Sequence, residues 1–103
     1  MAVLLQIDFS FPAEMMGDAL TEGARELAQS INREPGFISK IWTENAQTGE
    51  AGGIYVFTER TLAEQYAQMH RERVAGMGAS DIRVKIFDIN TPLTDINHGR
   101  YTA

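Results

Sequence analysis

Two side chains that could act together chemically, Trp42 and Glu44, lie two residues apart. In an extended segment alternate residues point to the same face, so the indole and the carboxylate would share one space. A carboxylate held among aromatic rings and away from water has a raised pKa and can act as a general base. We therefore predict Glu44 and Asp8 as acid–base candidates. Lys40 or Lys85 could instead neutralise either of them in a structural ion pair, and for Asp8 we favour that interpretation.

His70 is the second candidate for acid–base chemistry. It falls on one side of a predicted helix, together with Ala63, Tyr66, Ala67, Val74 and Met77. A histidine on such a stripe is more often a packed residue than a catalyst, but it could relay a proton if it faces a cavity. The other histidine, His98, receives no role. With two histidines and no cysteine, we predict no metal site and no disulfide.

Length and charge exclude several functional classes. The 103 residues suffice for one domain, which we place at 1–103, and the net charge is −5. Such a surface repels nucleic acid, and we read Arg71 and Arg73 as part of a solvated helix face. The apolar start, Met1 to Phe11, lacks the features of a signal peptide, and no stretch reaches transmembrane length. We therefore expect a cytoplasmic protein that has no membrane partner.

Hydrophobic periodicity predicts a βαββαβ order. The first helix carries an apolar stripe, begins between Pro12 and Asp18, and is stopped by Pro35-Gly36. Thr61 and Glu64 resemble a capping box for the second helix, which Gly76 and Gly78 end. The stripe consists of Met16, Leu20, Ala24, Leu27 and Ile31. The predicted strands are Val3–Phe9, Phe37–Asn45, Glu50–Thr58 and Asp81–Ile89. A tail follows the last strand, and its apolar anchors are Pro92, Leu93 and Ile96. This order predicts an α+β ferredoxin-like fold, with a four-stranded antiparallel sheet and both helices on one face.

The hairpin at Ala46–Gly49 predicts which side chains share a face. Pairing Asn45 with Glu50 sets Trp42 opposite Gly53. The residues that we assign to the helix side are Phe37, Ile41, Ile54 and Val56, together with Leu5, Ile7, Ile82, Val84 and Ile86. The residues that we assign to the helix-free side are Ile38, Lys40, Trp42, Glu44, Tyr55 and Phe57, together with Leu4, Gln6, Asp8, Arg83, Lys85 and Phe87.

An aromatic helix-free face needs cover, and a homodimer with opposed sheets would supply it. Sheets that do not close fully would leave a cavity lined by Trp42, Tyr55 and Phe57, with Gly52 and Gly53 leaving room for a ligand. Two other interpretations stay open. The aromatic residues could only fill the dimer interface, and the indole could only cover the gap at Gly53.

Four segments carry a resemblance to a known family. They are Asn32-Arg33-Glu34-Pro35-Gly36-Phe37, Trp42-Thr43-Glu44, Glu50-Ala51-Gly52-Gly53-Ile54-Tyr55, and Phe87-Asp88-Ile89-Asn90 followed by Pro92-Leu93 and Ile96-Asn97. In this order they resemble the YdhR-type monooxygenases of the dimeric α+β barrel superfamily.

The resemblance implies a homodimer that oxidises a small aromatic or quinol-like substrate with dioxygen and without a cofactor. A base deprotonates the substrate, and the resulting anion reduces dioxygen directly. In this chain Glu44 or His70 would be the base, while Trp42 and Tyr55 would donate hydrogen bonds and clamp the ring. Haem-degrading members of the superfamily use an Asn on the first strand, where this chain has Gln6, Ile7 and Asp8. The alternative function is a non-catalytic dimeric module that binds a small molecule or has a stress-related role.

Overall fold

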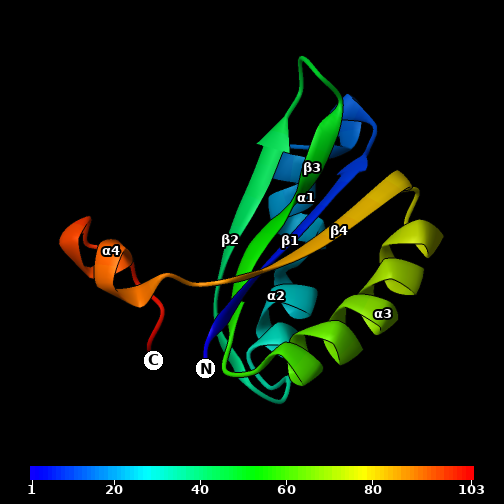
Figure 1. The fold of residues 1–103 in the computed structure, drawn as a ribbon. Helices are drawn as coiled ribbons and strands as arrows, with labels where there is room; N and C mark the ends of the chain where they lie inside the picture. Colours follow the sequence, from blue (N-terminus) through cyan, green and yellow to red (C-terminus); the bar gives the residue numbers. More distant parts are fainter.

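A computed structural model describes all residues, 1–103, as a four-stranded antiparallel sheet with the helical segments of residues 18–31 and 60–76 on one face (Figure 1). The strand order is β2-β3-β1-β4, which is the ferredoxin-like arrangement predicted from the sequence. The elements are β1 (Val3–Ser10), the 3-10 turn η1 (Ala13–Met15), α1 (Asp18–Gly23), α2 (Arg25–Ile31), β2 (Phe37–Asn45), β3 (Glu50–Phe57), α3 (Arg60–Gly76), β4 (Ser80–Asp88) and α4 (Thr91–Ile96).

The first helical segment is interrupted, although its apolar stripe is continuous. Ala24 adopts φ −106° and ψ 7° and separates α1 from α2. Met16, Ala24 and Ile31 are nonetheless buried, as the predicted stripe requires. Gly23 lies directly before the break, and glycine is a poor helix former, so the interruption falls where the sequence is weakest.

The second helical segment begins two residues earlier than a capping box at Thr61 would allow. Its N-cap is Glu59, whose side chain makes no capping hydrogen bond, and Thr61 lies inside the first turn of α3. The capping-box prediction is therefore wrong. The predicted end is confirmed, because α3 stops at Gly76 and Gly78 adopts φ +106°, a conformation that favours glycine.

The C-terminal tail is ordered and contains a short helix, α4. Asn90 caps it, since its side-chain oxygen accepts a hydrogen bond from the backbone N–H of Leu93 at 3.2 Å. Figure 1 shows α4 projecting beyond the end of the sheet. Leu93 and Ile96 are 59% and 69% exposed, so the predicted anchors have no cover within the single chain.

The predicted hairpin register is confirmed, but the predicted faces of β2 and β3 are wrong. Lys40 pairs with Tyr55 and Trp42 with Gly53, as expected. However, β1 pairs Leu5 with Tyr55, and directly paired residues point to the same side of a sheet. Because Leu5 is fully buried under the helices, Tyr55 has to face them too.

In β3, and in β2 from Lys40 onward, the residues predicted for the helix side lie on the helix-free side, and the residues predicted for the helix-free side lie on the helix side. The helix side carries Lys40, Trp42, Tyr55 and Phe57, whereas the helix-free side carries Ile41, Ile54 and Val56. A register shift between Phe37 and Ser39 leaves Phe37 on the helix side, as predicted, with its ring 6.0 Å from that of Phe57. The assignments for β1 and β4 are confirmed.

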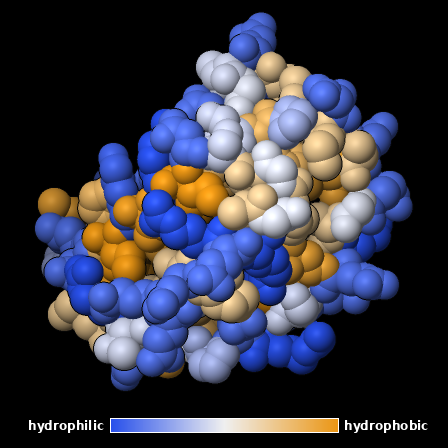
Figure 2. Space-filling view, turned by 90° about the vertical axis from the view of Figure 1, so that its right-hand side faces the viewer, coloured by the Kyte–Doolittle hydropathy of each residue, from blue (hydrophilic) through white to orange (hydrophobic).

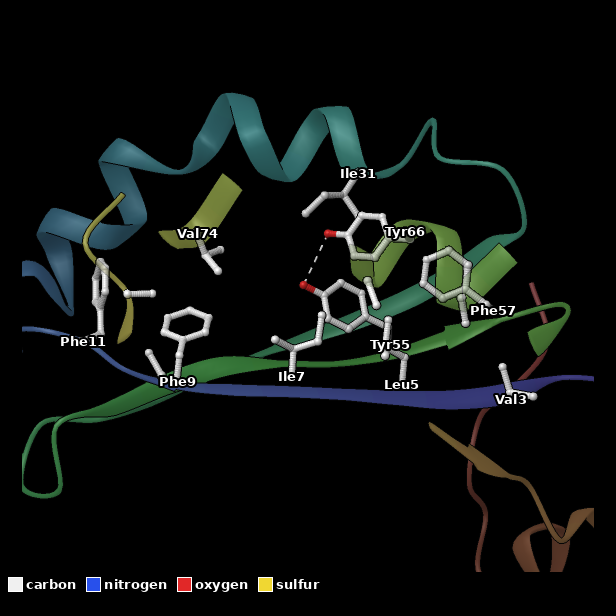
Figure 3. Packing of buried hydrophobic residues seen from close by; sticks show 14 of the residues in the cluster. Val3, Leu5, Ile7, Phe9, Phe11, Ile31, Tyr55, Phe57, Tyr66 and Val74 are labelled. Carbon is white, nitrogen blue, oxygen red and sulfur yellow. Dashed lines mark hydrogen bonds between the residues drawn. The ribbon is translucent and has the colours of Figure 1, made fainter. Parts of the chain in front are cut away.

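The core lies between the sheet and the helices (Figure 3). Tyr55 and Phe57 of β3 are fully buried and meet Tyr66 of α3, with ring centroids 5.1 and 5.3 Å from that of Tyr66. Hydrophilic side chains dominate the outer surface on the side where α3 runs, with apolar areas between them (Figure 2). Tyr55 and Phe57, which we expected on the helix-free face, therefore lie in the core.

Candidate functional site

A small cavity lies between the sheet and the helices. Its lining comes from both layers and consists of Phe9, Phe11, Leu20, Ala24, Leu27, Lys40, Trp42, Ala51, Gly52, Tyr55, His70, Val74 and Met77. Its volume is about 30 Å³, which is room for about two waters. Most of the lining is apolar, so the few polar groups stand in a poorly hydrated space.

A wider groove adjoins this cavity on the outside of the molecule. Its volume is about 390 Å³, and Leu20, Ala24 and Trp42 line both spaces. Trp42 is 38% exposed and therefore forms part of the boundary between them. Glu44 lines the groove and not the cavity. A ring too large for the cavity could reach it only if Trp42 moved.

Lys40 is the most unusual polar group of the cavity. Its Nζ atom lies 3.3 Å from the centroid of the Trp42 ring and 4.7 Å from that of Tyr55. It has no hydrogen-bond acceptor and no carboxylate partner within the chain, so the structural ion pair with Asp8 or Glu44 is absent. Because no fully buried side-chain nitrogen or oxygen lacks a partner, the Nζ atom keeps some contact with solvent. Burial, and secondarily the charge of Arg73, lower the pKa of Lys40 to about 7. The amine is therefore partly neutral at neutral pH.

His70 is buried and lines the cavity, as the conditional prediction for it required. Arg73 approaches its Nδ1 atom with Nε at 3.2 Å and with a terminal nitrogen at 2.8 Å. A guanidinium can only donate, so Nδ1 accepts and the ring proton of the neutral imidazole resides on Nε2. Burial, followed by the charges of Lys40 and Arg73, lowers the pKa of His70 to about 3. The ring is a neutral donor at physiological pH.

Two tyrosine hydroxyls continue this network (Figure 3). The hydroxyl of Tyr66 lies 3.4 Å from that of Tyr55, and Arg73 donates to Tyr66 at 3.5 Å. Burial raises the pKa of both phenols, so both stay protonated near neutral pH. Tyr55 lines the cavity, as predicted for a substrate-contacting residue, although it does so from the helix side of the sheet.

Glu44 differs from the shielded carboxylate that the sequence led us to expect. It is exposed, and its Oε2 atom accepts a hydrogen bond of 3.3 Å from the backbone N–H of Gly17, directly before α1. The expected removal from water is therefore wrong for the single chain. Asp8 lies on the opposite face and accepts a hydrogen bond from Gln6 at 2.8 Å.

Phe57 and Gly53 lie beside the cavity without lining it. Phe57 packs in the core beneath the helices and not in the dimer interface that the packing alternative assumed. A Cβ atom on Gly53 would lie 2.6 Å from Cε of Lys40, so the space beside this glycine is filled by the lysine and not by the indole of Trp42. A Cβ on Gly52 would overlap the carbonyl oxygen of Ile7, so that glycine allows close strand pairing.

Sequence reasoning missed two residues of the site, Lys40 and Arg73. Lys40 was considered only as a counter-ion, because the hairpin register alone does not say which face is buried. Arg73 was read as solvated, but it is partly buried against His70 and Tyr66. The spacing of three residues between His70 and Arg73 was the available signal, since side chains three apart meet on a helix. Arg71 is exposed, as expected.

Two structural observations bear on other ligands. The chain gathers no group of three or more His, Cys, Asp or Glu side chains that could hold a metal ion. Its helices are all too short or too polar to cross a bilayer.

Comparison with known proteins identifies the family. No curated protein matches the chain. The family model described as "Putative mono-oxygenase ydhR" matches residues 4–100, which is nearly the whole chain and includes every residue of the cavity. The chain therefore belongs to the ydhR mono-oxygenase family.

Proposed function

We propose that this protein is a cofactor-independent monooxygenase whose substrate is a small phenol or quinol. The ring of the substrate would lie in the groove beside Trp42, and its hydroxyl would enter the cavity. The observation that carries the proposal is the position of Lys40. Its amine lies in an apolar space between two aromatic rings, without a carboxylate partner, and has a pKa of about 7. A base with a pKa near the working pH is the most effective at proton transfer.

Lys40 is a better base here than the two candidates named from the sequence. The imidazole of His70, with a pKa of about 3, binds a proton weakly. Glu44 lines the outer groove but not the cavity, and it accepts a backbone hydrogen bond. We therefore assign proton removal to Lys40 and a hydrogen-bonding role to His70. Glu44 would contact the part of a substrate that extends into the groove.

The proposed reaction consumes one dioxygen for each phenol and releases a quinone and water. Lys40 takes the hydroxyl proton, and the phenolate passes electrons directly to dioxygen. One oxygen atom becomes bonded to a ring carbon that loses its hydrogen, and the other leaves as water. The substrate loses four electrons and dioxygen gains four, so no external reductant is required. The protein's part is an apolar site, a base, and donors for the developing oxyanion.

We also propose that the protein works as a homodimer, on a basis that differs from the original one. The helix-free face presents Ile41 and Phe87, which are 66% and 47% exposed, and α4 presents Leu93 and Ile96. A hollow of about 530 Å³ lies between this face and the tail. A second copy of the chain would cover these apolar residues, and the sheets would then face each other.

Oxygen uptake with a panel of phenols and hydroquinones tests the proposal. We expect uptake with equal formation of quinone in metal-free buffer, and a loss of about two orders of magnitude in kcat for Lys40→Met. The control is Arg33→Met, which changes an exposed cationic residue between α2 and β2, away from the cavity. Glu44→Gln should mainly change KM, because Glu44 would contact the substrate in the groove but would not take its proton.

Two results would contradict this assignment. If Glu44→Gln abolishes uptake while Lys40→Met does not, the original assignment of Glu44 as the base is correct. If phenols quench the fluorescence of Trp42, the only tryptophan, saturably but no member of the panel supports oxygen uptake, the protein is a binding module.

A further inference from the structure

The polar side chains that line the cavity are all hydrogen-bond donors. Lys40, Trp42, Tyr55 and His70 are the polar members of the lining, and no Asp, Glu, Asn, Gln, Ser or Thr is among them. An ammonium group and an indole N–H have no acceptor capacity at all. A ligand group that enters this space therefore meets donors and aromatic rings, and few acceptors.

Arg73 orients His70 and Tyr55 so that each can donate a hydrogen bond to a ligand. Because it donates to Nδ1 of His70, the imidazole proton is held on Nε2, which makes no hydrogen bond within the chain. Because Arg73 also donates to the Tyr66 hydroxyl, that hydroxyl donates in turn to Tyr55. The proton of the Tyr55 hydroxyl is then left free for a ligand.

The cluster also carries positive charge that the chain does not neutralise. Neither Lys40 nor Arg73 forms an ion pair, although the protein as a whole has a net charge of −5. The charge of Glu34 contributes to the raised pKa of Tyr66, but Glu34 forms no ion pair with Arg73. Charge in a poorly hydrated site is costly unless it is paired, so a ligand of opposite charge would be favoured there.

We infer that the cavity selects an anionic group, a carboxylate or phenolate on a small aromatic molecule, which Lys40 pairs with and the Nε2–H of His70 hydrogen-bonds. Arg73 is a positioning residue in this arrangement, since it fixes the orientation of the donors without reaching the ligand. The inference rests on the proposed function for the location of the substrate. It adds that the bound form is the anion, which is the state that proton removal from a phenol creates.

Benzoate and benzamide distinguish an anion site from a merely aromatic site, because they share a ring and differ in charge. Their binding is measured by quenching of Trp42 fluorescence, without dioxygen turnover. We expect benzoate to bind about tenfold more tightly than benzamide at about pH 6, as expected for a charge-assisted contact. Lys40→Met should remove this preference, and the control Arg33→Met should retain it.

A second measurement can be made on the parent protein, so it does not require that a variant fold. In ¹⁵N spectra of the histidine rings, His70 should show the Nε2–H tautomer, and benzoate should shift its Nε2 resonance. His98, in the exposed tail, is the internal control and should not respond. Arg73→Gln should allow the other tautomer to appear.

Several outcomes would overturn the inference. They are benzamide binding as tightly as benzoate, no binding of benzoate at millimolar concentration, or an unchanged His70 resonance on benzoate binding. Failure here is distinguishable from failure of the proposed function. Oxygen uptake without an anion preference would overturn only this inference, whereas benzoate binding without any oxygen uptake would overturn only the oxygenase.

Discussion

Replacing Lys40 by methionine should stabilise the folded protein, and by an amount that depends on pH. The pKa of Lys40 falls from 10.5 to about 7 on folding, chiefly because the amine is buried. Between these two values the unfolded chain keeps a proton that the folded chain lacks. Stability contributed by Lys40 is therefore fully present only above about pH 10.5 and is lost as the pH falls to about 7. Methionine has no proton to lose and similar length.

The magnitude follows from the size of this shift. A difference of one pKa unit corresponds to about 1.4 kcal/mol, so the fall from 10.5 to about 7 corresponds to at most about 5 kcal/mol. Lys40 retains some contact with water, and its ammonium form gains about 1 kcal/mol from the ring of Trp42, so we expect about 2–3 kcal/mol. The advantage of Lys40→Met over the parent should shrink by this amount between about pH 6 and pH 10.

Urea denaturation followed by far-ultraviolet circular dichroism measures the difference at a fixed protein concentration. Fluorescence is unsuitable, because Trp42 lies against the replaced side chain. Arg33→Met, at an exposed position between α2 and β2, is the control and should differ from the parent by the same amount at every pH. If the difference in unfolding free energy between Lys40→Met and the parent does not change with pH, Lys40 is not held as a buried, partly neutral amine, and its role as a base loses its support.

The remaining predictions concern strand pairing and assembly. Gly52→Ala should destabilise the protein by at least about 2 kcal/mol in urea denaturation, because the added Cβ meets the backbone of Ile7. The control Gly23→Ala, whose added Cβ has open space, should stabilise the protein slightly. Equal effects of the two variants would contradict the packing argument. Light scattering should give about twice the mass of 11.5 kDa, and truncation after Ile89 should weaken dimerisation. A truncated chain that dimerises as tightly as the full one would show that α4 has another purpose.

Local patterns in the sequence were sufficient for the order of the elements and for the family. The apolar stripe from Met16 to Ile31 and the alternation in the strands depend only on near neighbours, so their periods are visible in the chain itself. The hairpin register could also be predicted, because a short loop limits how Asn45 and Glu50 can pair. The segments around Trp42 and Gly53 carried the resemblance that the family match confirmed.

The face on which Tyr55, Trp42 and Lys40 lie was decided by the tertiary structure. A hairpin has two faces that its own register does not distinguish, and a shift of one residue would exchange them. Pairing of β3 with β1, which sets Tyr55 opposite Leu5, makes the choice, and these residues are 50 positions apart in the sequence. The same long-range packing places Lys40 of β2 near His70 and Arg73 of α3. Their altered pKa values arise from burial and from charges on another element, which no local pattern encodes.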